Sequence, residues 1–171
     1  MPKDYVCVFV CFSTKAIHLE AKSDLSTTTF LSAFQRFVAR RGCHLHSNNG
    51  TNFVGACIIL ARAFVQTTKQ ANPANYGHQN VQWHFLLAGA PHMGGLWEAG
   101  VKSFKAHIRK IGGPFKYTFE EFSTLLVRIE ACLNSRPISP QSDDPSGLSA
   151  LTPGHFITGG SAPISIVNRW Q

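Results

Sequence analysis

A short polar row is the first feature of this sequence that could carry chemistry. One carboxylate and three cations follow one another at intervals of four, three and four residues: Glu98, Lys102, Lys105 and Arg109. On a helix these intervals place all four side chains on one face. Such a face could hold a metal ion with the carboxylate and a phosphate backbone with the cations. On spacing alone, however, an ordinary solvated face with a Glu-to-Lys pair is the favoured interpretation.

The segment that must position this row is a predicted helix from Gly95 to Ile111. A separate apolar stripe runs through it at helical spacing: Trp97, Val101, Phe104, Ile108 and Ile111. Gly112-Gly113-Pro114 ends it. Thr118 and Glu121 then form the capping box of a following helix. The predicted buried face of that second helix consists of Phe119, Phe122, Leu125, Leu126, Ile129 and Leu133.

Strands come first in the chain, and helices dominate its second half. Tyr5 to Phe12 is typical of a strand buried on both faces, and Ala16 to Glu20 alternates as its half-buried hairpin partner. Ser26 is the expected N-cap of the next helix. The pattern further predicts a strand over 43–47, a helix over 53–65 and a strand over 81–86. This order predicts an α/β sandwich with a mixed sheet.

Composition indicates one globular domain with a polyanionic partner. The 171 residues are 44% hydrophobic and include 13 Phe, which excludes a disordered tail. The net charge of +7 favours nucleic acid, although a merely soluble basic protein would have the same composition. The five Cys have no regular spacing, so an intracellular, reducing setting is expected. The apolar run over 5–12 is too short to span a membrane, and no membrane association is expected.

Five blocks of the sequence resemble, in order, the integrase catalytic core of BEL/Pao-type LTR retrotransposons, a family similar to the retroviral integrases. They are 8–20 (VFVCFSTKAIHLE), 47–55 (SNNGTNFVG), 90–99 (APHMGGLWEA), 130–137 (EACLNSRP) and 151–156 (LTPGHF). Five ordered blocks are far more specific than any single motif. The resemblance implies a ribonuclease H-like fold, with a mixed sheet flanked by helices. We expect this catalytic-core-like domain over 1–137, followed by a Pro/Ser-rich extension over 138–171 with a short helix near 152–158.

The resemblance also implies an active site, which this chain carries only in part. Members of the family cut and join DNA with two Asp and one Glu that hold divalent ions, for which Mg²⁺ suits the hard oxygen ligands. The Glu falls on Glu98 and is retained, whereas the second Asp falls on Asn48. The first Asp belongs to a central strand that precedes the hairpin and has no counterpart here. Asp4 sits at the wrong end of the wrong strand to replace it.

The charge of the site decides what these replacements mean. Three carboxylates would give the site −3, and Glu98 alone gives it −1. A single carboxylate should hold Mg²⁺ weakly or not at all, because this ion sheds its water reluctantly. We therefore expect this chain alone to be inactive in strand transfer. DNA binding would remain, through phosphate contacts of Lys102, Lys105 and Arg109. The acids Glu20 and Asp24 are expected to have structural or capping roles rather than to replace the lost ligands.

Two other interpretations stay open. The chain could be an active integrase represented by an incomplete gene model. For the missing strand itself, a truncated or decayed element copy is the favoured explanation. It could instead be a domesticated protein-interaction module, because integrase cores dimerise through helical faces and a homodimer is possible here. A functional integrase would act in the nucleus.

A second group of metal-binding side chains is interpreted as ordinary. Cys43, His44 and His46, with His84 or His92 elsewhere, have no standard zinc-finger spacing. On a strand, His44 and His46 would share one face and Cys43 would oppose them. We therefore expect ordinary strand residues rather than a zinc site.

Overall fold

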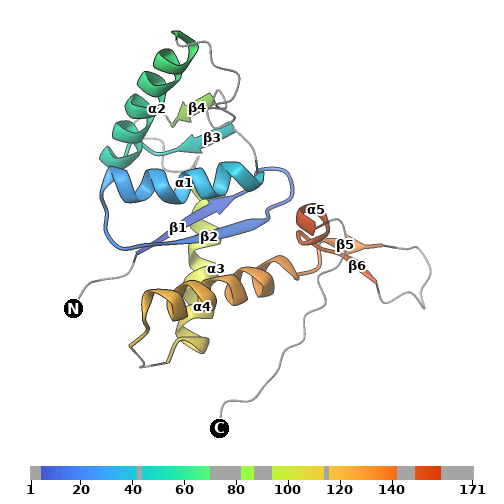
Figure 1. The fold of residues 1–171 in the computed structure, drawn as a ribbon. Helices are drawn as coiled ribbons and strands as arrows, with labels where there is room; N and C mark the ends of the chain where they lie inside the picture. The colour runs from blue at the N-terminus through green and yellow to red at the C-terminus, as the bar shows by residue number, and fades with distance from the viewer. Residues whose placement is uncertain are drawn as a thin grey trace. The chain divides into compact units, whose positions relative to one another are not determined.

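The computed structural model describes residues 5–41, 44–69, 82–86, 94–113, 116–141 and 149–158. Helices and strands alternate along the chain much as the sequence predicts (Figure 1). The elements are β1 (Tyr5–Val10), β2 (Ile17–Lys22), α1 (Thr27–Arg41), β3 (His44–Ser47), α2 (Thr51–Lys69), β4 (Gln82–Phe85), α3 (Gly95–Ile111), α4 (Phe119–Asn134), β5 (Ser139–Pro140), β6 (Ala150–Leu151) and α5 (His155–Thr158). No helix within the described ranges is long and apolar enough to cross a bilayer.

The strands form three separate two-stranded sheets rather than one mixed sheet. β1 and β2 pair as a hairpin, whose turn is closed by a 2.8 Å hydrogen bond from the Cys11 N–H to the Ala16 carbonyl. β3 and β4 are parallel, and β5 and β6 are antiparallel. Among the described residues, no strand joins the hairpin to the β3–β4 pair. The hairpin is therefore as expected, whereas the pairing of β3 with β4 and the β5–β6 pair were not predicted, and a single mixed sheet is not observed among the described residues.

By its internal contacts the chain divides into two compact units. The first contains residues 1–7 and 20–95, and the second contains residues 8–19 and 96–171. The hairpin contributes to both, because each of its strands is shared between them. The predicted boundary at residue 137 rests on composition and stays a prediction.

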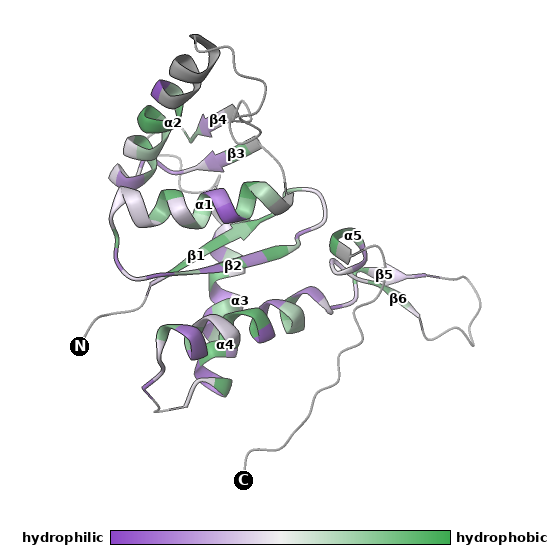
Figure 2. Cartoon of the chain, viewed as in Figure 1, coloured by the Kyte–Doolittle hydropathy of each residue, from purple (hydrophilic) through white to green (hydrophobic). Residues whose placement is uncertain are grey.

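Aromatic rings form the core of the first unit. Phe30 and Phe34 of α1 are each 2% exposed. Figure 2 shows hydrophobic and hydrophilic stretches alternating along this helix. The Phe30 ring meets Phe53 of α2 edge-on at 5.0 Å between centroids, and the Phe34 ring lies 5.8 Å from Trp83 of β4. Burial of such side chains contributes about 1.5–3 kcal/mol each. Ser26 begins α1 as predicted, because its Oγ accepts the Thr29 N–H at 3.3 Å.

Helix α4 provides the largest share of the apolar core of the second unit. Its buried residues are Phe122, Leu125, Leu126, Ile129, Leu133 and Asn134. The predicted capping box is confirmed, since Thr118 Oγ1 accepts the Glu121 N–H and the Glu121 carboxylate accepts the Thr118 N–H. Phe119 was expected on the buried face but is 47% exposed, as is Ile111 at 42%. Both lie at helix ends, where a side chain has fewer neighbours to pack against.

The burial of the two hairpin strands is the reverse of the sequence prediction. All six residues of β2 are buried, including the polar His18, Glu20 and Lys22, whereas β1 is only partly buried. Alternating polar side chains indicated a half-exposed strand, but each of these polar groups is accommodated inside. Glu20 accepts from Arg36 of α1 at 2.6 Å, and Lys22 lies 6.0 Å from the Phe30 ring.

Candidate functional site

Asn48 lies in a tight turn between β3 and α2. Its Oδ1 accepts a hydrogen bond from the Gly50 N–H at 3.1 Å, so the amide oxygen closes the turn on itself. The neighbouring Asn49 donates from Nδ2 to the Leu86 carbonyl at 3.0 Å, just past the end of β4. Gly50 is closely surrounded, because an added Cβ would lie 3.0 Å from Asn52 Oδ1. The turn thus uses its polar side chains for local structure.

Residues of β4, and Leu86 directly after it, hold the end of the strand that leads into this turn. Ser47 Oγ accepts the Trp83 Nε1–H at 2.9 Å and donates to the Asn48 carbonyl at 2.9 Å. The Leu86 N–H also donates to the Ser47 carbonyl at 2.9 Å. Since Trp83 is packed among the core phenylalanines, the position of the Asn48 backbone is fixed by the core of the first unit.

The polar row predicted on the third helix is present and faces solvent. Glu98 lies in the first turn of α3, where the helix dipole favours a carboxylate. Glu98, Lys102, Lys105 and Arg109 are all exposed, and Phe104 and Gly100 form the buried side. Within the part of the chain that the structure describes, no ion pair involves the three cations.

The donor atoms at the family's metal positions fit Mg²⁺ poorly. Asn48 offers an amide oxygen without charge, and that oxygen already accepts from the backbone. Glu98 is one exposed carboxylate. Over the described ranges no three His, Cys, Asp or Glu side chains gather in a group that could hold an ion. Asn48 belongs to the first unit and Glu98 to the second.

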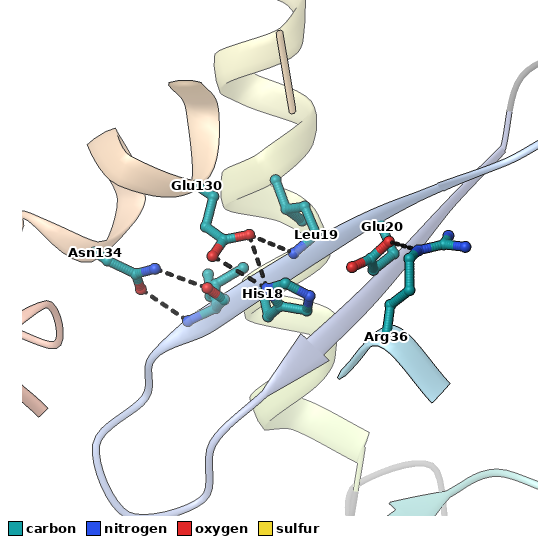
Figure 3. Close-up of polar contacts among 7 residues, drawn as sticks. His18, Leu19, Glu20, Arg36, Glu130 and Asn134 are labelled. Carbon is teal, nitrogen blue, oxygen red and sulfur yellow. Dashed lines mark hydrogen bonds and ion pairs between the residues drawn. The ribbon is translucent and has the colours of Figure 1, made fainter. Parts of the chain in front are cut away.

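Sequence reasoning missed a polar clamp between α4 and the hairpin, shown in Figure 3. Asn134 Oδ1 accepts the Ile17 N–H at 2.8 Å, and its Nδ2 donates to the Ile17 carbonyl at 2.7 Å. Glu130 accepts the Leu19 N–H at 2.9 Å and contacts His18 Nδ1 at 3.1 Å. Glu130 and Asn134 thus occupy the hydrogen-bonding edge of β2 that a further strand would otherwise use.

A third member extends this clamp to the tip of the hairpin. Arg136 donates from Nη2 to the Lys15 carbonyl at 2.6 Å and from Nη1 to the Leu133 carbonyl at 2.9 Å. The contact with the Leu133 carbonyl satisfies a backbone acceptor in the last turn of α4. The clamp therefore reaches Lys15 in the turn and Ile17 and Leu19 of β2, the last two spaced by two along one strand edge. From the sequence, only the spacing of two along the strand, together with the helical spacing of Glu130 and Asn134, could have indicated this clamp.

The acids considered as substitute ligands have structural roles. Glu20 forms the 2.6 Å ion pair with Arg36 described above. Asp24 accepts from the Ser26 N–H and the Thr29 hydroxyl, both at 2.7 Å, in front of α1. The hydrogen bonds from Ser26 and Thr29 lower the pKa of Asp24 from its ordinary value. Both residues therefore act as the sequence predicts, outside any metal site.

Comparison with known proteins gives a match in structure but not in sequence. The chain matches no protein-family model and no curated protein. Its structure is similar to the catalytic core domain of BIV integrase, with a TM-score of 0.60 over 91% of this chain and 86% of that one. The two are 15% identical, so the likeness establishes the fold alone. The chain therefore has a mixed α/β fold of the integrase catalytic-core type.

Proposed function

We propose that this chain is an integrase catalytic-core-like domain derived from a BEL/Pao-type retrotransposon polyprotein, which binds DNA without catalysing its joining. The proposal of DNA binding rests on the exposed cationic row on α3. The integrase-type fold and the five ordered sequence blocks support the origin. The poor fit of Asn48 and Glu98 to Mg²⁺ supports the loss of catalysis.

The length of the row suits a phosphate backbone. From Lys102 to Arg109 is seven residues, or about 10 Å along a helix that rises 1.5 Å per residue. Phosphates of one DNA strand follow one another about every 3.4 Å along the duplex axis, so the row spans about three of them. Contacts of this kind carry no base information, and binding should tolerate any sequence.

Salt dependence and charge reversal test the binding. Three phosphate contacts predict a slope of about −2.7 for log affinity against log salt on duplex DNA. Reversing Lys102, Lys105 or Arg109 to Glu should lower the magnitude of that slope by about 0.9 for each residue. Lys110→Glu is the matched control, since it changes net charge equally on the same helix but lies off the row. Equal effects of all four variants, or binding that ignores salt, would overturn the assignment.

Catalysis needs a separate measurement. The purified chain with Mg²⁺ should neither nick nor join DNA at concentrations where binding is complete. Asn48→Asp should leave the salt slope unchanged, because this residue is outside the cationic row. Robust Mg²⁺-dependent joining by the unaltered chain would show that it is an active integrase. The homodimer expected through helical faces stays a prediction, which light scattering on a sizing column can check.

A further inference from the structure

Two histidines on the β3–β4 pair form a feature that the proposed function does not use. His46 and His84 are Cα partners in the parallel register of these strands. Their rings are stacked, with centroids 4.7 Å apart and planes 19° from parallel, and both residues are exposed. We propose that this pair binds one divalent transition-metal ion of the Zn²⁺, Ni²⁺ or Cu²⁺ class.

The chemistry of the pair selects this class of ion. Imidazole nitrogen is the ligand that these three metals share, whereas Mg²⁺ and Ca²⁺ prefer oxygen. Two nitrogens bound to one tetrahedral ion, each at about 2.0–2.1 Å, lie about 3.4 Å apart. The rings lie with centroids 4.7 Å apart, and rotation about their side-chain torsions would turn one nitrogen of each towards a shared ion.

The position of the pair leaves room for the remaining ligands of the ion. Strand alternation places the histidines on the face opposite Ser47 and Trp83, which hydrogen bond to each other beside the core. The exposed face can admit the ion together with its water. In the proposed site the two imidazoles are the protein ligands, and water completes the coordination of the ion.

Binding would tie together two short strands. β3 and β4 have four residues each, and the histidines are one residue before the Ser47–Phe85 pair that ends both strands. An ion bridging this register would hold the end of β3 beside β4, directly before the Asn48 turn. Because the bridge exists only in the folded state, occupancy should raise thermal stability.

The sequence prediction treated these histidines as ordinary because their separation along the chain matches no zinc motif. The structure favours a shared role for the two histidines, because the parallel pairing of β3 and β4 places residues 46 and 84 opposite each other. Of the other residues named with them, Cys43 and His92 lie outside the described residues, and His44 is paired with Gln82 in the same register. The proposed site consists of His46 and His84, one residue from each strand.

A titration of the metal-stripped full chain with Ni²⁺ tests the proposal. We expect one ion per chain by calorimetry and a rise in melting temperature. His46→Gln and His84→Gln should each abolish both effects, because a single imidazole is left. His107→Gln is the matched control, since this α3 histidine bonds to the Ser103 carbonyl away from β3 and β4. Cys11→Ser controls for binding at the exposed thiol.

The outcomes separate cleanly. Ni²⁺ binding that survives either substitution in the pair, or that is lost equally in a control, would overturn the proposal. If a substituted chain does not fold, the unaltered chain decides the question through imidazole NMR signals during a Zn²⁺ titration. Shifts at both His46 and His84 support the site, and the absence of shifts at either residue refutes it. This test does not measure DNA binding. A negative result for the metal site therefore leaves the proposed function unchanged.

Discussion

Replacing Asn134 with alanine tests how α4 holds the hairpin. The Asn134 side chain is 5% exposed and satisfies both the N–H and the carbonyl of Ile17. Its removal leaves two buried backbone groups without their partners, at a cost of about 1–3 kcal/mol each. Alanine regains about 0.5–0.7 kcal/mol of helix propensity. We expect a net loss of about 3 kcal/mol in the free energy of unfolding, or a fall of about 6–12 °C in melting temperature.

Urea unfolding and amide hydrogen exchange together provide the assay. The Ile17 amide should be protected in the native chain and should exchange much faster in Asn134→Ala. Val127→Ala is a matched control, because it truncates a residue of the same helix that is 63% exposed, and such changes usually stay within about 0.5 kcal/mol. A destabilisation below about 0.5 kcal/mol with Ile17 still protected would show that the clamp does not hold β2.

Three further predictions concern local features. Thr118→Ala removes the N-cap of α4 and should lower the free energy of unfolding by about 1 kcal/mol in urea titrations. Gly113→Ala should cost about 1–2 kcal/mol, because Gly113 has a φ of 52°, whereas Gly95→Ala, with no atom within 4 Å of the added Cβ, should cost nothing. Iodoacetamide at pH 8 should label Cys11 and spare Cys7, as peptide mass spectrometry would show. Partial burial raises the pKa of Cys11, but hydrogen bonds from Thr14 and Ser13 outweigh this effect, so the pKa is lowered. Burial instead raises the pKa of Cys7 to about 11.

The raised pKa of the Cys7 thiol also has a consequence for stability. Since the folded-state value of about 11 exceeds the ordinary value of 9.0, the folded chain holds this proton more tightly than the unfolded chain does. The stability that the protonated Cys7 thiol contributes to the folded chain is fully present below about pH 9 and is lost as the pH rises towards 11. The Cys7 thiol therefore destabilises the fold only in alkaline solution.

Features encoded by neighbouring residues could be predicted from the sequence, whereas those that depend on distant segments could not. The capping box of Thr118 and the end of α3 at Gly112 and Gly113 are confirmed, because caps and stops act within one helical turn. The burial of β2 was predicted wrongly, since Glu130 and Asn134 lie more than a hundred residues away in sequence. No local pattern records that a distant helix will occupy a strand edge.

The candidate site shows the same division. Exposure of the α3 row followed from helical spacing, which is a local property. The pairing of His46 with His84 depends on a parallel register across a long connection, and spacing along the chain gave no sign of it. The number of sheets was also beyond local patterns, because the runs of β-branched residues specify strands but not which strands pair.

The clamp explains how a chain can keep an integrase-type fold whether or not it binds a metal ion. The block over 130–137 supplies Glu130, Asn134 and Arg136, all three of which hold the hairpin by hydrogen bonds. In the block over 151–156, the Gly154 N–H donates to the Asn134 carbonyl at 2.9 Å. These contacts contribute to folding whether or not an ion is bound, so their presence says nothing about catalysis. Of the two residues that the resemblance places at the metal site, Glu98 is solvent-exposed, and Asn48 makes a local contribution by closing its own turn with an amide oxygen. A loss of catalytic carboxylates is therefore compatible with the integrase-type fold, and binding and catalysis have to be measured separately.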